Sequence, residues 1–313
     1  MQHSVGIIGA PFSKGQPKDG VECAPNKLRA AGLLERLQQQ CAVKDYGNLT
    51  FENVALDEPV KGSKSVRTVG SANQRLSEAV KALKRDGHTA VMLGGDHSLA
   101  IGSIHGHTAA VGPVSVVWVD AHADIHTPLT SNTGNIHGQP MSYLLYELQS
   151  KPPLPNFSWM KPCLSSRDLV YIGLRDVDPE EYIMKLLAVK AFSMTQVDQL
   201  GVAKVMEETC DYLWDSKKPI HLSYDIDAID PSVTPATGTP AVGGLTYREG
   251  IYITEYLCQT LLSAVDMVEV NPLRGRTEDD VHSTVSTAVD LLLGCFGRRR
   301  EGNHLPDYSL PEP

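Results

Sequence analysis

Three short strand-like runs in this chain are each followed by aspartate or histidine residues, and this feature constrains the fold more than any other. The runs span residues 90–93, 114–119 and 220–224. The polar residues that follow them are His97, then Asp120, His122 and Asp124, and then Asp225 and Asp227. The apolar run at 114–119 predicts a buried strand, the other two runs are candidate strands, and side chains at alternate positions of a strand point to one face. We therefore expect these six side chains to gather at the rim of one sheet.

Strand-like and helix-like segments alternate along the chain, which is typical of a parallel sheet covered by helices on both faces. The candidate strands cover residues 5–8, 42–46, 90–93, 114–119, 169–172, 189–193, 220–224 and 267–270. Helical spacing and capping boxes predict helices at 26–39, at 72–85, from Thr246 to 262 and from Thr277 to about 297. We expect one α/β domain over residues 1–313, with about eight parallel strands and a surface tail at about 306–313.

The polar clusters favour a metal site. At a single strand end, Asp and His are also typical of helix caps and solvated loops, so one cluster alone leaves both interpretations open. Four carboxylates on buried strands, however, would repel one another unless cations neutralised them. Six ligands are too many for one octahedral ion that keeps a water, and they serve two ions only if carboxylates bridge. Mostly oxygen ligands with one imidazole per ion favour two Mn²⁺ about 3.5–4 Å apart, although other divalent ions stay possible.

Composition narrows the class of partner and the compartment. Asp and Glu number 37 against 28 Lys and Arg, so the formal charge is −9, which disfavours nucleic acid and mildly favours a cationic ligand. The six cysteines are scattered without paired spacing, which predicts reduced thiols in the cytoplasm. No apolar stretch approaches the length of a membrane span, and the first strand begins too early to leave room for a signal peptide.

Five separated segments carry a resemblance to a known family. They are Gly-Gly-Asp-His-Ser-Leu (94–99), Asp-Ala-His-Ala-Asp (120–124), Gly-Asn-Ile-His-Gly-Gln-Pro (134–140), Asp-Ile-Asp-Ala-Ile-Asp-Pro (225–231) and Thr-Pro-Ala-Thr-Gly-Thr-Pro (234–240). In this order they resemble the motifs of the ureohydrolases, and of animal arginases in particular, and the match extends over almost the whole chain. The resemblance implies an arginase/deacetylase-like fold, hydrolysis of L-arginine to L-ornithine and urea, two Mn²⁺ per subunit and a homotrimer.

The resemblance also implies the roles of individual residues. His97, Asp120, Asp124 and Asp225 would hold one ion, and His122, Asp120, Asp225 and Asp227 would hold the other. A guanidinium carbon reacts slowly with water alone, so a hydroxide bridging the ions is expected to attack it, while Asp124 carries a proton to the departing nitrogen. Glu269 would pair with the guanidinium, and His137 would shuttle protons to solvent. Two simpler interpretations stay open: Glu269 could be an acid at the end of a strand, and His137 could be a loop histidine bonded to the backbone.

Substrate recognition depends on residues outside the metal cluster. By resemblance, Asp178 would hold the α-amino group of arginine, Asn135 would hold the α-carboxylate, and Thr239 would line the site. Two positions depart from the arginase pattern, because His126 replaces an Asn and Thr133 replaces the common Ser. Thr keeps the hydroxyl, whereas His changes both size and protonation. At the subunit contact, the family uses positions matching Arg248, Glu249 and Arg300.

Other functions stay open at this point. Agmatinase or another guanidino-acid ureohydrolase would use the same metals, and a non-catalytic relative would keep only the fold. Deacetylation on a related sheet is disfavoured by Glu269 and by a ligand set of two His and four Asp. Asp230 is expected to hold an Asp-Pro turn. The histidines outside the motifs, which we expect to be structural or solvated, are His88, His105, His107, His221, His282 and His304.

Overall fold

A computed structural model describes residues 4–148, 154–214 and 217–300, so the expected tail at about 306–313 lies outside the described residues. Eight strands form one parallel sheet. They are β1 (Ser4–Gly9), β2 (Ala42–Asn48), β3 (Thr89–Leu93), β4 (Ser115–Val119), β5 (Leu169–Leu174), β6 (Lys190–Ser193), β7 (Ile220–Asp225) and β8 (Leu262–Val268). Their order across the sheet is β2-β1-β3-β8-β7-β4-β5-β6. Every hydrogen-bonded pair is parallel, which confirms the expected fold class.

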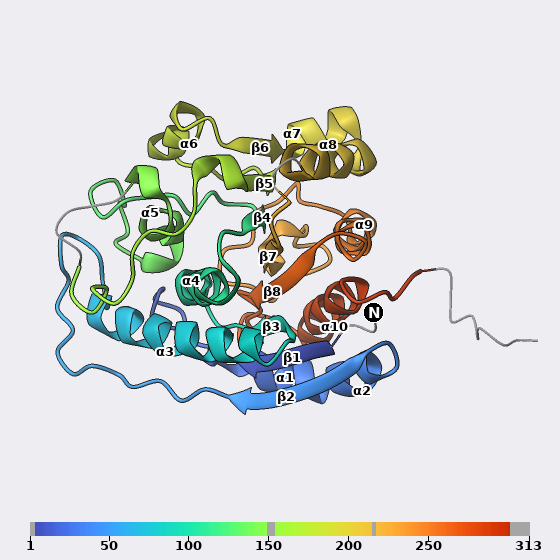
Figure 1. The fold of residues 1–313 in the computed structure, drawn as a ribbon, viewed down its shortest axis with the longest axis horizontal. Coiled ribbons are helices and arrows are strands. Elements are labelled where there is room, and N and C mark those ends of the chain that lie inside the picture. The colour runs from blue at the N-terminus through green and yellow to red at the C-terminus, as the bar shows by residue number, and fades with distance from the viewer. Residues whose placement is uncertain (1–3, 149–153, 215–216, 301–313) are drawn as a thin grey trace, which may run out of the picture.

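Helices cover both faces of this sheet (Figure 1). One face packs against α1 (Ala24–Ala30), α2 (Leu33–Gln38), α7 (Met194–Leu200), α8 (Val202–Trp214), α9 (Tyr247–Leu257) and α10 (Glu278–Gly294). The other packs against α3 (Val66–Arg85), α4 (Ala100–Val111), α5 (Pro140–Leu144) and α6 (Ile183–Leu186). Short 3-10 helices are η1 (Val21–Cys23), η2 (His97–Leu99), η3 (Ile136–Gly138), η4 (Tyr146–Leu148), η5 (Ser166–Asp168), η6 (Pro179–Tyr182) and η7 (Ile226–Ala228). Each helix among the described residues is too short or too polar to span a membrane.

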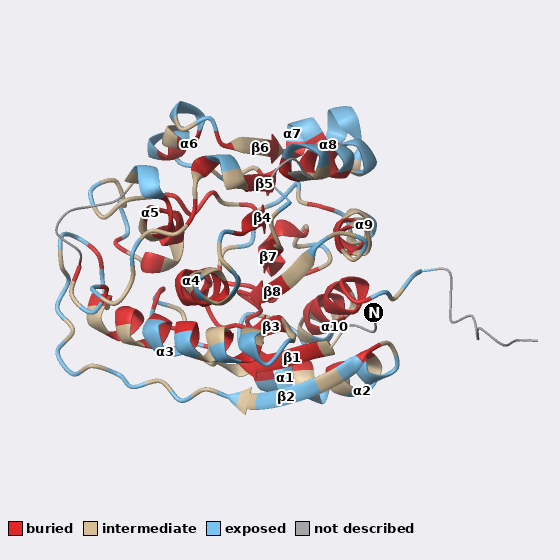
Figure 2. Cartoon of the chain, in the orientation of Figure 1, coloured by how far each residue is buried: buried red, intermediate tan, exposed pale blue. Residues whose placement is uncertain are grey.

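The core follows the alternation of side chains along the strands. In β4, Val117 and Val119 pack on the α9 and α10 side, whereas Val116 and Trp118 pack on the α4 and α5 side. Because both faces are covered, β4 is buried along its whole length, as a central parallel strand requires. Figure 2 shows the buried residues along the sheet and on the inner sides of the helices, with exposed residues on the outer sides of α3 and α8.

The order of the strands brings the ends of four of them together. The strands β1 to β3 occupy one half of the sheet and β4 to β6 the other, and β7 and β8 then fill the space between β3 and β4. The carboxyl ends of β3, β8, β7 and β4 are therefore neighbours at one edge. Open parallel sheets bind ligands at such a point, where the strand order reverses.

The first two predicted helices have different bounds in the structure. The segment predicted as one helix at 26–39 forms α1 and α2, because Gly32 between them adopts a left-handed φ of 80°. The helix predicted from residue 72 begins at Val66 instead. The free backbone N–H groups of its first turn are satisfied by a residue outside the helix. Asp57 accepts hydrogen bonds from the backbone N–H groups of Arg67 (3.2 Å) and Thr68 (2.8 Å).

The helix predicted from Thr246 to 262 ends at Leu257, and the strand predicted at 267–270 is β8, which begins at Leu262. The strand β8 carries two polar residues that have hydrogen-bond partners, partly buried Ser263 and buried Asp266. Ser263 binds Lys84 and His107, and Asp266 binds Ser103 (2.6 Å) and His221 (2.9 Å). A pattern of apolar residues therefore does not reveal where this strand begins. It ends before Glu269, which has a φ of 60°.

Candidate metal centre

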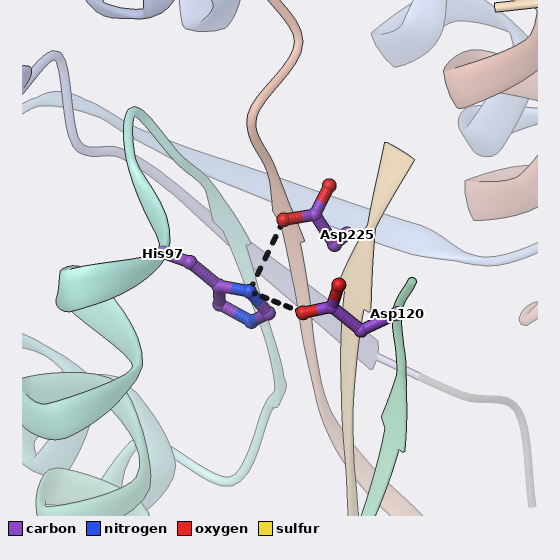
Figure 3. Close-up of side chains that lie close together, drawn as sticks. All are labelled: His97, Asp120 and Asp225. Carbon is purple, nitrogen blue, oxygen red and sulfur yellow. Dashed lines mark ion pairs between the residues drawn. The ribbon is translucent and has the colours of Figure 1, made fainter. Parts of the chain in front are cut away.

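Two groups of acidic and histidine side chains lie at the rim formed by β3, β4 and β7, and each group could hold a metal ion. The first contains His97, Asp120 and Asp225, and Figure 3 shows His97 facing the two carboxylates. Its Nδ1 atom lies 3.1 Å from Asp120 Oδ2 and 3.2 Å from Asp225 Oδ2. The second group contains Asp120, His122 and Asp227. His122 Nδ1 lies 3.3 Å from both Asp120 Oδ1 and Asp227 Oδ2. Asp120 thus faces both groups, one oxygen to each.

Asp124 joins the first group, although not for the reason that the sequence suggested. Its Oδ2 atom lies 3.2 Å from His97 Nδ1. The alternation of a strand does not bring it there, because β4 ends at Val119 and Asp124 adopts a left-handed φ of 49°. The expectation of a regular extended segment from Asp120 to Asp124 is therefore wrong. An irregular segment, with a strained backbone at Asp124, aims this carboxylate at the cluster instead.

Hydrogen bonds fix the orientation of the cluster. Trp118 Nε1 donates to Asp120 Oδ2 (2.9 Å), and the backbone N–H of His122 donates to Asp120 Oδ1 (2.7 Å). Asp225 accepts from the backbone N–H of Asp227 (2.8 Å). His97 stacks on Trp118 with ring centroids 3.9 Å apart, and its Nε2 lies 2.9 Å from Ser223 Oγ. With Nε2 bound in this way, Nδ1 is left for the carboxylate side.

The donor set fits divalent cations. His97 Nδ1 is fully buried without a well-formed hydrogen bond, although three carboxylate oxygens surround it. Burial and the neighbouring carboxylates raise the pKa of Asp225 well above its usual range, and burial with Asp120 also raises the pKa of Asp124. Burial opposes the charge of His97, yet the carboxylates raise its pKa well above the usual range. Without cations, the negative charge of the cluster is reduced by bound protons, as these raised pKa values indicate. Cations at this point would compensate that charge instead.

His137 and Glu269 lie next to the first group. His137 Nδ1 is 3.1 Å from Glu269 Oε1, and the backbone N–H of His97 donates to the same oxygen at 2.9 Å. Burial lowers the pKa of His137, but Glu269 outweighs it, and the pKa rises to about 9. Glu269, like Asp124, is a buried non-glycine residue with a positive φ. The strain at both positions fits residues whose direction matters for chemistry.

The residues predicted to contact substrate lie on the loops around this cluster. Thr239 Oγ1 donates to Asp227 Oδ2 at 3.0 Å, which places it beside the second group. His126 Nε2 lies 3.2 Å from Asp178 Oδ2. Asp178, which is predicted to hold the α-amino group of the substrate, and His126, which departs from the family pattern, are therefore direct neighbours. Thr133 Oγ1 accepts from the backbone N–H of Asn135 at 3.2 Å.

The residues predicted to form the subunit contact lie elsewhere, on α9 and beyond α10. Glu249 closes the capping box of α9 with Thr246, as predicted. Arg300 Nη1 donates to the backbone oxygen of Arg248 (3.2 Å), and its Nη2 donates to Glu255 (2.9 Å).

Sequence reasoning missed several residues that shape the site. Trp118 and Ser223 orient Asp120 and His97, and both stand two positions before a predicted ligand at the end of a strand. The same alternation that singled out the ligands could have found them. Asp176 lies 3.4 Å from His122 Nε2, and no spacing pattern pointed to it. Asp96 is fully buried next to His97, and the sequence motif that contains it gave it no role of its own.

Comparisons with known proteins agree on one family. The family model described as "Arginase family" matches residues 3–297. The chain is 59% identical to human Arginase-1 over 98% of both chains. Among solved structures, the arginase of Bacillus caldovelox superposes with a TM-score of 0.87 at 35% identity, covering 96% of this chain and 100% of that one. The Entamoeba histolytica arginase in complex with L-ornithine gives 0.85 at 30% identity, covering 95% and 100%.

Proposed function

This chain belongs to the arginase family, and from that membership we infer that it is a hydrolase that converts L-arginine to L-ornithine and urea. The observation that carries the inference is the 59% identity to human Arginase-1 over nearly the full length of both chains. The buried His and Asp cluster supports it, because hydrolysis of a resonance-stabilised guanidinium needs an activated water.

We propose that the cluster holds two Mn²⁺ per subunit. The first would be held by His97, Asp120, Asp124 and Asp225, and the second by His122, Asp120, Asp225 and Asp227. In support, Asp120 directs its two oxygens to the two histidines, at 3.1 and 3.3 Å, as a bridging carboxylate would. When bound, such ions lower the pKa of water to near neutrality and polarise the group under attack.

The protein groups around the cluster would orient the substrate and move protons. Glu269 would hold the guanidinium through its carboxylate, an arrangement that favours paired hydrogen bonds. Asp124 would carry a proton to the nitrogen that leaves as the amine of ornithine. His137, which lies 3.1 Å from Glu269, would exchange that proton with solvent, since its side chain is still one-fifth exposed.

Recognition of the α-carbon would fall to the loops. Asp178 would bind the α-amino group, and Asn135, Thr133 and His126 would contact the α-carboxylate, with Thr239 lining the site beside Asp227. Agmatine lacks the carboxylate but keeps the amine. Agmatinase or another guanidino-acid ureohydrolase is therefore the second candidate function, and the residue that favours weighing it is His126, which departs from the arginase pattern at the carboxylate contact.

A urea-release assay tests these proposals. The purified enzyme is stripped of metal, reloaded with Mn²⁺, and supplied with arginine or agmatine in parallel. We expect urea from arginine, dependence on Mn²⁺ and two ions per subunit by elemental analysis. Faster release from agmatine would favour the second candidate, and one bound ion would contradict the binuclear assignment.

We further propose a homotrimer with Arg248, Glu249 and Arg300 at the subunit contact, and a cytoplasmic location. Arg300 already packs on α9 through Arg248 and Glu255, so its guanidinium is fixed at the surface of the subunit. All six cysteines are unpaired, which suits a reducing compartment. Sedimentation of the wild type and of Arg300→Ala would test the assembly, and cell fractionation of the full chain would test the location.

A further inference from the structure

We propose that Asp96 is a positioning residue for the reaction, which holds the His137 segment in place through the backbone of Gly15. The inference rests on the proposed function, because it concerns the residue assigned to proton exchange. Asp96 lies between Gly95 and the candidate ligand His97, and its two carboxylate oxygens accept hydrogen bonds from the backbone N–H groups of Gly15 and Ser98. It is fully buried, and none of the roles assigned so far uses it.

The contacts form a continuous path. Asp96 Oδ2 accepts a hydrogen bond from the backbone N–H of Gly15 at 2.8 Å. The carbonyl oxygen of Gly15 accepts from the backbone N–H of His137 at 3.0 Å. The N–H and the carbonyl group of Gly15 thus connect the carboxylate of Asp96 to the main chain of η3. The side chain of His137 then reaches Glu269, 3.1 Å away.

A capping role does not account for both oxygens of Asp96. Its Oδ1 accepts from the backbone N–H of Ser98 at 3.0 Å and caps η2, which is a local contact that Ser or Asn could also make. The second oxygen contacts Gly15, which is 81 residues away in the sequence. Only a two-oxygen side chain makes the cap and the distant contact together.

The packing around Gly15 supports the same assignment. A Cβ atom built on Gly15 would lie 2.2 Å from Asp96 Oδ1 and 2.5 Å from Ser98 Oγ. The backbone at 15 can therefore approach the carboxylate only without a side chain. The preceding loop is fixed as well, because the oxygen of Phe12 accepts from the N–H of Asp96 at 3.0 Å. The position of η3 consequently depends on the contact between Asp96 and Gly15.

Two variants break this path at different points. Asp96→Ser keeps an oxygen that can cap η2 but removes the acceptor for Gly15. Gly15→Ala leaves Asp96 unchanged and forces the two apart. Asp230→Asn serves as the matched control, because Asp230 also holds loop amides, those of Gly243 and Gly244, at 2.8 and 3.0 Å. Each protein is examined with Mn²⁺ bound, by amide hydrogen exchange and by steady-state kinetics.

We expect amide exchange at Gly15 and His137 to accelerate in both path variants and not in the control, with Ser98 still protected in Asp96→Ser. Turnover should fall by no more than it does in His137→Asn, because both variants act through the position of His137. KM and metal content should be unchanged, and added imidazole should restore part of the turnover. Combining Asp96→Ser with His137→Asn should lower turnover no further than His137→Asn alone.

Several results would overturn the proposal. Unchanged amide exchange at His137 in both path variants would show that the contact between Asp96 and Gly15 does not hold the His137 segment, that is, that no tether exists. Faster exchange with normal turnover, or a loss that imidazole does not restore, would show that the tether does not position His137. If the wild type released no urea from arginine, the proposed function would fail, while the exchange measurements would still decide whether Asp96 holds the His137 segment.

Discussion

The departure from the arginase pattern at His126 yields a prediction about pH. His126 Nε2 lies 3.2 Å from Asp178 Oδ2, and its Nδ1 lies 3.3 Å from Thr130 Oγ1. An imidazole ordinarily gains a proton below about pH 6.5, whereas the Asn of the family donates at any pH. The protonated pair of His126 and Asp178 would match the zwitterionic α-carbon of arginine, carboxylate to imidazolium and amine to carboxylate. Arginine binding should therefore weaken as pH rises.

The exposure of the pair limits the size of the effect. The side chain of His126 is 11% exposed and that of Asp178 is 60% exposed, so solvent screens the charges. Ion pairs of this kind contribute about 0.2–1 kcal/mol, which corresponds to a change in KM of up to about fivefold. Turnover should be nearly unaffected, because the contact is the same in the ground state and the transition state.

The assay measures KM and kcat for arginine from about pH 6 to 9.5 in the wild type and in His126→Asn, a range that brackets the imidazole pKa. The variant should bind arginine more tightly than the wild type above neutrality and show a flatter profile. Agmatine, used as a substrate or competitor, lacks the carboxylate and should show no difference between the two proteins. Asp178→Asn should weaken both ligands, because both carry the amine. Superimposable arginine profiles would mean that His126 does not contact the substrate.

Three further predictions follow from the site and the core. Asp124→Asn removes a ligand charge and the proton carrier together, so turnover should fall by more than the roughly 10²–10⁴-fold typical of lost acid–base catalysis; near-normal turnover in a variant that holds two metals would refute the assignment. His137→Asn should lower turnover modestly, keep its metal and respond to imidazole, and loss of metal on elemental analysis would make His137 a ligand instead. Burial, His221 and Lys84 lower the pKa of His107 to about 2, so the folded protein keeps it neutral while the unfolded chain gains a proton below about pH 6.5. Stability should then decline as pH falls from about 6.5, and urea unfolding of His107→Gln should show a slope shallower by about 1.4 kcal/mol per pH unit, whereas equal slopes would contradict the neutral assignment.

Local patterns in the sequence determined the elements and the chemistry of the ligands. The run at 114–119 is mostly apolar because β4 is buried on both faces, and such a run is recognisable without knowledge of its neighbours. The Asp and His residues that follow the predicted strands are likewise recognisable from the sequence alone, because they come directly after the strand ends. Capping boxes at Thr246 and Thr277 also act within one turn, and the structure contains both.

Only the tertiary structure decided which of these features meet. The insertion of β7 and β8 between β3 and β4 makes four strand ends adjacent, and strand order depends on long-range pairing that no local pattern records. The strand β8 accommodates two polar residues because partners on α3, α4 and β7 form hydrogen bonds with Ser263 and Asp266. The contact between Asp124 and His97 and the path from Asp96 through Gly15 to His137 likewise join segments far apart in the chain. Such contacts depend on packing between elements, and periodicity carries information only within one.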